Sequence, residues 1–128
     1  MKILIDTCSF LWFIEDNPKL SSLAKNLIED EDNEIFLSII SVWEIAIKTS
    51  IGKLSITDTL SEFIETQVKV NDIKLLNINL EDTYLVSSLP FHHKDPFDRL
   101  IISQAITGKL PIISYDSIFD SYPVSRLW

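Results

Sequence analysis

Short apolar runs and longer stretches with helical periodicity alternate along the chain. The apolar runs are too short for stable helices, and such runs are typical of strands buried on both faces of a sheet. They predict strands at residues 1–5, 35–39, 73–78 and 110–114, and a weaker pattern allows a fifth at 124–127.

The stretches between the strands repeat apolar residues at the spacing of one helix face. The clearest covers residues 20–28 and predicts a helix that starts near Ser21. Further helices are expected at 9–15, 41–52, 60–68 and 81–88, with Ser41 capping the second of these and Thr57 or Asp58 the third. Proline is favoured at the first helical position, so Asp95 and Pro96 predict the cap and first residue of a last helix, which ends at Gly108.

This alternation of apolar strands and helices predicts an α/β fold. We expect a three-layer sandwich with a central, mainly parallel sheet flanked by helices, in a single domain covering residues 1–128. No apolar run approaches the roughly 20 residues of a membrane-spanning helix, and none has the form of a signal peptide. With Cys8 as the one cysteine, a disulfide within the chain is excluded, and a soluble protein of the reducing cytoplasm is expected.

The charge balance narrows the choice of partners. Eleven Lys and Arg residues against nineteen Asp and Glu give a formal net charge of −8. Such a field repels phosphate backbones and attracts a basic partner, so a general electrostatic nucleic-acid binder is disfavoured. Action on a nucleic acid would require a local positive patch or bound cations.

Four acidic residues occupy corresponding places in the predicted fold. Asp6 and Asp116 follow the first and fourth strands, Glu44 follows the second, and Asp98 lies in the first turn of the helix before the fourth. Ligands of open α/β sheets bind outside the carboxyl ends of the strands, so we expect these acids to meet there. An all-oxygen cluster suits Mg²⁺, with Mn²⁺ as the alternative, and such an ion assists attack of water on a phosphate.

Each acid also has a structural interpretation. Ser41 and Glu44 fit a helix capping box, and Glu44 and Lys48 have the spacing of a favourable i, i+4 ion pair. Asp98 could simply favour a helix N-terminus, and Asp6 and Asp116 could be turn residues, because aspartate is common in both places. We favour the metal site, because four independent structural reasons would otherwise have to place acids at one edge.

Four segments carry a family resemblance: Ile5-Asp6-Thr7, residues 41–48, residues 92–101 with the sequence Asp-Pro-Phe-Asp-Arg inside it, and Ser114-Tyr115-Asp116. In this arrangement they resemble PIN-domain proteins, and in particular the VapC-type toxins of bacterial toxin–antitoxin pairs. The likeness spans essentially the whole chain. Its most specific part is the Asp-Pro-Phe-Asp-Arg sequence.

The resemblance implies a Mg²⁺-dependent endoribonuclease, often a homodimer, that a cognate antitoxin inhibits. Matched by position, Asp6, Glu44, Asp98 and Asp116 are its catalytic and metal-binding acids, with RNA as the substrate. Glu44 is expected to orient or deprotonate the attacking water. Asp95 is assigned to capping.

Neighbours of these acids are expected to contact the substrate. Cys8 stands where relatives often have a hydroxyl or a histidine, so the hydroxyl contact is expected from Thr7, with Ser9 as the alternative. Lys48 is assigned to substrate contact for its charge. Arg99 either grips a phosphate or forms a surface salt bridge with Asp95. The surrounding positive or titratable residues are His92, His93, Lys94, Arg99, Lys48 and Lys53.

Other chemically distinctive residues receive plainer interpretations. His92 and His93 are expected to be solvated loop residues, because a hard cation prefers oxygen ligands. Cys8 is expected to be a small buried residue. The aromatic residues Trp12, Phe13 and Trp43 are expected in the core or a dimer interface, with base stacking as the less favoured alternative.

Two rival functions remain at this stage. A phosphoaspartate enzyme of the haloacid-dehalogenase type would need a second aspartate two residues after Asp6, where Cys8 stands. A catalytically silent PIN-like scaffold would keep its acids only for folding or for docking a basic protein partner. Specific uptake of Mg²⁺ distinguishes the nuclease from the scaffold.

Overall fold

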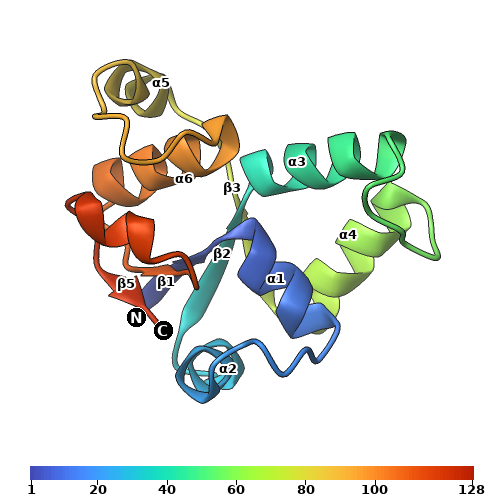
Figure 1. Ribbon diagram of the computed structural model, residues 1–128. Coiled ribbons are helices and arrows are strands. Elements are labelled where there is room, and N and C mark those ends of the chain that lie inside the picture. The colour runs from blue at the N-terminus through green and yellow to red at the C-terminus, as the bar shows by residue number, and fades with distance from the viewer.

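The computed structural model describes residues 1–128 and shows a five-stranded sheet with helices on both faces (Figure 1). Every strand pair is parallel, which confirms the predicted α/β class. The strand order is β3-β2-β1-β4-β5. The strands are β1 (Lys2–Ile5), β2 (Glu34–Ser38), β3 (Ile73–Leu76), β4 (Ile112–Ile113) and β5 (Arg126–Leu127).

Six α-helices and one 3₁₀ helix connect and cover the strands. They are α1 (Thr7–Ile14), α2 (Ser22–Glu29), α3 (Ile39–Ser50), α4 (Leu60–Val70), α5 (Leu80–Val86), α6 (Pro96–Thr107) and η1 (Ser117–Ser121). In Figure 1, α1, α2 and α4 lie on one side of the sheet and α5 and α6 on the other. None of the helices is both long and apolar enough to cross a bilayer.

Alternation along the strands divides the core into two layers. On β1, Ile3 and Ile5 point toward the layer that α1, α2 and α4 cover, whereas Leu4 points toward the layer beneath α6. Ile40 and Ile45 show that α3 contributes to both layers. The two layers hold the carboxyl ends of the strands in a fixed relation, and the functional residues extend from these ends.

Four of the predicted elements have boundaries that differ in the structure. Helix α3 begins at Ile39, directly after β2, because the Ser38 hydroxyl accepts a hydrogen bond from the Ile40 amide at 3.0 Å; Ser41 is not its cap. Helix α4 is capped by Thr59, whose hydroxyl accepts from Glu62, rather than by Thr57 or Asp58. The third and fourth strands are shorter than predicted, because apolar character alone does not show where ladder pairing stops.

Candidate active site

The four predicted acids line one cavity beyond the carboxyl ends of β1 and β4. The volume of this cavity, which we call the acidic cavity, is about 340 Å³. Five carboxylates and a single ammonium group line it, so it is strongly negative. Its lining residues are Asp6, Thr7, Cys8, Glu44, Lys48, Asp95, Asp98, Tyr115 and Asp116.

Asp6 combines a structural role with a place in the cavity. It is the N-cap of α1, and its Oδ1 accepts a hydrogen bond from the Ser9 amide at 2.8 Å. The residue is only 5% exposed, and this burial, more than the nearby charge of Glu44, raises the pKa of its carboxyl group. Capping therefore accounts for part of the role of Asp6, but it does not explain why this carboxylate is buried.

Glu44 is not part of a capping box, because Ser41 lies inside α3 and accepts a hydrogen bond from the Thr7 hydroxyl at 2.8 Å. The predicted pair with Lys48 is confirmed, with 2.6 Å between Lys48 Nζ and Glu44 Oε2. The other oxygen, Oε1, is buried and has no hydrogen-bond partner. A buried carboxylate oxygen without a partner is costly, so this atom calls for a positive ligand or a proton donor.

Asp98 carries the clearest electrostatic signature of the cavity. The pKa of its carboxyl group is raised to about 8, mainly by burial and then by the charges of Asp6, Asp95, Glu44 and Asp116, in that order. Such crowding favours the protonated form unless something positive compensates it. The site is thus built for a bound positive charge.

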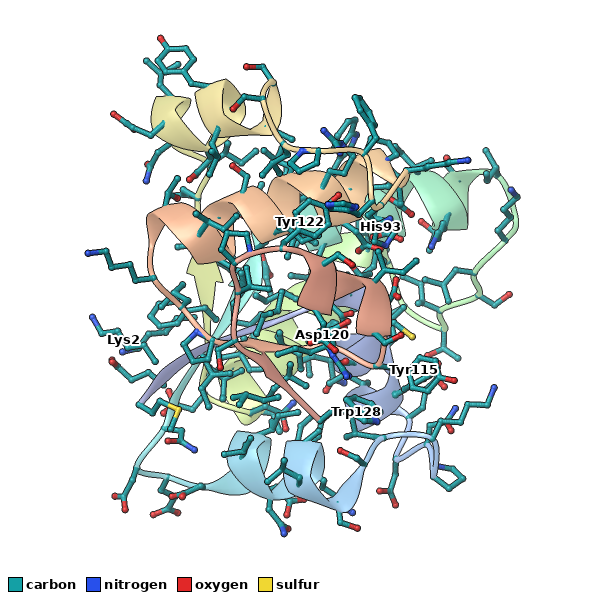
Figure 2. The ribbon with its side chains drawn as sticks, turned by 60° about the vertical axis from the view of Figure 1, so that its left-hand side comes forward. Lys2, His93, Tyr115, Asp120, Tyr122 and Trp128 are labelled. Carbon is teal, nitrogen blue, oxygen red and sulfur yellow. The ribbon has the colours of Figure 1, made fainter.

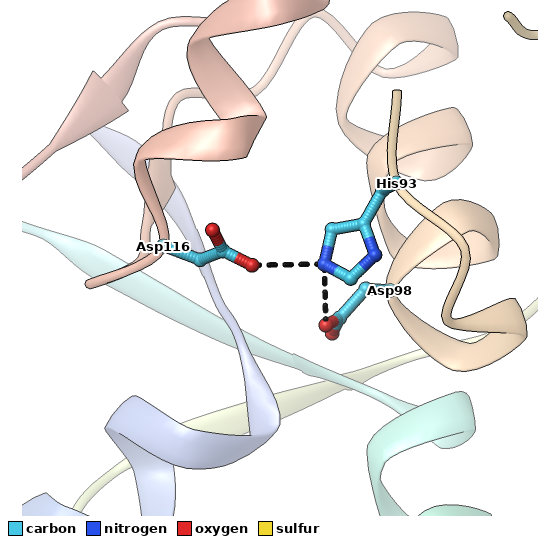
Figure 3. A group of neighbouring side chains, drawn as sticks. All are labelled: His93, Asp98 and Asp116. Carbon is cyan, nitrogen blue, oxygen red and sulfur yellow. Dashed lines mark hydrogen bonds and ion pairs between the residues drawn. The ribbon is translucent and has the colours of Figure 1, made fainter. Parts of the chain in front are cut away.

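His93 is the residue that the sequence did not reveal. Figure 3 shows its imidazole between the carboxylates of Asp98 and Asp116. Nε2 lies 3.1 Å from Asp98 Oδ2 and 2.8 Å from Asp116 Oδ2, and the side chain is only 11% exposed. The expectation of a solvated loop residue was wrong for His93, whereas His92 is exposed as predicted. The sequence feature that could have indicated this position of His93 is its place two residues before Asp95, the capping aspartate of α6.

The backbone fixes which nitrogen of His93 carries the proton. The Asp95 amide donates to His93 Nδ1 at 3.1 Å, so Nδ1 is an acceptor and the neutral ring carries its hydrogen on Nε2. Nε2 is therefore a donor to the two carboxylates and has no free lone pair for a metal. We infer that His93 orients acids rather than ligating an ion.

This assignment predicts a specific NMR result. In metal-free protein, ¹H–¹⁵N correlation spectra of the imidazole, recorded over several pH values, should show the neutral His93 ring protonated on Nε2 because the Asp95 amide occupies Nδ1. Exposed His92 serves as an internal comparison. A proton on Nδ1 of neutral His93 would contradict the donor role.

Arg99 does not face the acidic cavity, and both of its predicted roles were wrong. The residue is 6% exposed, and its guanidinium donates to four backbone carbonyls of the segment that leads into α6. The reason is geometric: the first turn of α6 points Asp98 into the cavity and the next residue toward that segment. Asp95 is confirmed as the cap of α6, accepting from the amides of Phe97 and Asp98.

Two further expectations need correction. Cys8 is exposed at the cavity rather than buried, because the first turn of α1 presents it to solvent. Of the two places expected for Trp43, the core is excluded and the dimer interface stays a prediction: 55% of the residue is exposed, with its ring edge-to-face against Phe97 at 5.0 Å. Trp12 and Phe13 do pack against the core as predicted, although each is only partly buried.

The residues present fit a hard divalent cation. The cavity offers carboxylate oxygens, which Mg²⁺ and Mn²⁺ prefer, and the partnerless Oε1 of Glu44 lies among them. The raised pKa of Asp98 shows that the single ammonium of Lys48 does not neutralise the cluster. Thr7, predicted to bind substrate, lines the cavity, although its hydroxyl hydrogen is given to Ser41.

With this geometry established, comparison with known proteins identifies the family. The chain matches the PIN domain family over residues 3–124 and therefore belongs to that family. Comparison with curated protein sequences gives no significant match.

Solved structures share the fold at low sequence identity. The VapBC2 structure from Rickettsia felis, bound to a DNA fragment from its promoter, is 16% identical with a TM-score of 0.72, and the match covers 100% of both chains. VapBC-5 from Mycobacterium tuberculosis is 18% identical with a TM-score of 0.59, over 98% of this chain and 94% of that one. FitAcB from Neisseria gonorrhoeae is 15% identical with a TM-score of 0.64, over 98% and 96%.

Proposed function

We propose that this PIN-domain protein is a divalent-metal-dependent endoribonuclease and the toxin of a toxin–antitoxin pair. The observation that carries the proposal is the convergence of Asp6, Glu44, Asp98 and Asp116 on one cavity at the carboxyl ends of the strands. The family membership supports the biological role, as does the likeness to two VapBC structures, one of which is named as a member of the VapBC family of toxin–antitoxin systems.

The proposed ion is Mg²⁺, with Mn²⁺ as the alternative. It would be held by Asp6, Asp98 and Asp116. When bound, the ion lowers the pKa of coordinated water and stabilises negative charge on the attacked phosphate. His93 Nε2–H holds Asp98 and Asp116 in their relative orientation. Glu44 accepts the proton of the attacking water at Oε1, because Oε2 is occupied by Lys48.

Lys48 has a second role in this proposal. Its side chain is 43% exposed and its ammonium lies on the cavity wall, where it can meet a phosphate oxygen while remaining beside Glu44. Thr7 contributes a hydroxyl oxygen at the same wall. A positive charge at this place offsets part of the repulsion between an acidic protein and RNA.

The proposed partners follow from charge and from exposed apolar surface. A net charge of −8 favours a basic antitoxin segment laid across the acidic cavity. A homodimer would cover exposed apolar side chains such as those of Trp43 and Ile51, which are 55% and 58% exposed. A reducing cytoplasmic setting agrees with Cys8 as the one cysteine and with its exposure.

Cleavage of RNA by the purified protein tests the proposal. Incubation with total RNA and Mg²⁺ should produce new ends that a chelator prevents, and Asp6→Asn should reduce cleavage by roughly 100-fold or more. Asparagine caps helices as well as aspartate does, so the fold should persist, with an unfolding midpoint no lower than that of the wild-type protein. The exposed Asp58→Asn serves as the control.

Two results would argue against this function. Cleavage by the Asp6→Asn variant at the wild-type rate would remove the metal-site assignment. Absence of specific Mg²⁺ or Mn²⁺ uptake in calorimetry, together with absence of cleavage, would favour a catalytically silent scaffold that binds a basic protein.

A further inference from the structure

We propose that a hollow beside the acidic cavity is a subsite for one nucleobase of single-stranded RNA next to the scissile phosphate. Trp12, Lys19 and Tyr115 line this hollow, which we call the aromatic hollow, and its volume is about 370 Å³. The inference rests on the proposed ribonuclease function and adds to it the place where the substrate's base is held.

The aromatic hollow and the acidic cavity share Tyr115 as a lining residue. This residue directly precedes Asp116, one of the four acids. It is 63% exposed, so its ring is available to a ligand. A nucleotide whose phosphate enters the acidic cavity would have a neighbouring base within reach of Tyr115.

The aromatic side chains are fixed by mutual packing. Trp12 and Tyr115 meet edge-to-face with 5.7 Å between ring centroids, and Trp128 lies 5.7 Å from Tyr115 and 6.1 Å from Trp12. Figure 2 shows Tyr115 and Trp128 side by side below η1. Aromatic rings already held in place lose little freedom on binding, and every base has a face on which they can stack.

Lys19 supplies the positive charge that an RNA backbone needs. Its Nζ lies 5.8 Å from the Trp12 ring centroid and is within 4.0 Å of no carboxylate, so its charge is not already committed to an ion pair. By contrast, Lys48, which lines the acidic cavity, is paired with Glu44. In a protein of charge −8, an unpaired lysine beside exposed aromatic rings favours a phosphate-bearing aromatic ligand over a basic peptide.

Binding of a labelled oligonucleotide tests the subsite. The experiment uses the full chain carrying Glu44→Gln, which keeps the three proposed metal ligands but should not cut, with Mg²⁺ present. The probe is a fluorescein-labelled single-stranded oligouridine, followed by anisotropy. In this background Tyr115→Ala should weaken binding roughly tenfold, the loss expected for one stacked base.

Lys19→Gln should weaken binding several-fold and reduce the slope of log affinity against log salt by about one, because one phosphate contact is lost. Matched controls are Tyr84→Ala, which removes an equally exposed tyrosine on α5, and Lys69→Gln on α4. Both controls should bind as the parent protein does. With an oligonucleotide that has abasic sites in place of its bases, the Tyr115→Ala effect should disappear.

The outcomes separate the two proposals. If the parent protein binds and cleaves RNA but Tyr115→Ala and Lys19→Gln behave like the controls, the subsite is overturned, the hollow is left as a protein-binding surface, and the ribonuclease function stands. A Tyr115→Ala effect that persists on the abasic probe would also overturn base stacking. If the parent neither binds nor cleaves RNA, the proposed function fails and the subsite fails with it.

Discussion

In protein freed of divalent ions, Asp98→Asn should increase the free energy of unfolding at pH 8. The Asp98 carboxyl group has a pKa of about 8 in the folded protein, against 3.8 for an ordinary aspartate. Between these values the folded state keeps a proton that the unfolded chain releases, so the stability of the wild-type protein falls as pH rises from about 4 to about 8. Asparagine cannot ionise, and this loss should disappear.

The expected gain is on the order of 3 kcal/mol at pH 8, after allowance for the part of the carboxylate that water reaches. Denaturant unfolding of both proteins in a chelator, at several pH values, measures it. Asp58→Asn, an exposed aspartate, should leave the wild-type pH profile unchanged. A wild-type profile that is level across this window would refute the crowding of carboxylates that the metal site requires.

Although more stable without metal, Asp98→Asn should be less active than the wild-type protein. We expect Asp98→Asn to lose RNA cleavage by roughly 100-fold and to lose the stabilisation that Mg²⁺ gives to the wild-type protein, because a neutral amide binds the ion weakly. A gain in metal-free stability coupled to a loss of activity is typical of a residue kept for function at the expense of folding. For an acid kept only to cap a helix, replacement by asparagine would leave the metal-free stability nearly unchanged.

Much of the fold and the position of the acids could be predicted because both depend on local patterns. Asp6 directly follows a run of apolar residues, and Asp98 follows a Pro-containing helix start, so each could be placed near the strand ends without coordinates. The parallel topology then brings residues that are distant in sequence to one edge. The four acids therefore converge because of the strand order and register, not because of any single motif.

The surroundings of the acids could not be predicted in the same way. The position of His93 depends on a loop whose path is set by Tyr122, the hydroxyl of which accepts from the His93 amide at 2.8 Å and donates to the Pro90 carbonyl at 2.7 Å. These contacts join segments about 30 residues apart and have no periodic signature. The directions of Asp98 and Arg99 could not be predicted either. The two residues are adjacent in sequence, but they point to different sides of α6.

Arg99 leads to the prediction with the largest effect on stability. Arg99→Met should lower the free energy of unfolding by roughly 3–5 kcal/mol, because it leaves four buried or partly buried carbonyl groups without their charged donor. The Arg99 guanidinium donates to the carbonyls of Pro90 at 2.9 Å and Leu89 at 3.1 Å, and to those of Val86 and His93 at 3.2 and 3.3 Å. Methionine keeps much of the apolar volume, so the loss reports the hydrogen bonds. Denaturant unfolding monitored by circular dichroism measures it.

Arg126→Met is the matched control, since the chain has one other arginine. Arg126 pairs with Asp120, whose side chain is 55% exposed, and such partly solvated pairs contribute roughly 0–1 kcal/mol. Arg99→Met should also free the His93 loop and thereby weaken Mg²⁺ binding, which Arg126→Met should not do. Equal destabilisation by the two variants would show that Arg99 is not what ties this loop to α6. If Arg99→Met kept full stability but lost RNA cleavage, the phosphate-binding role rejected on geometric grounds would have to be restored.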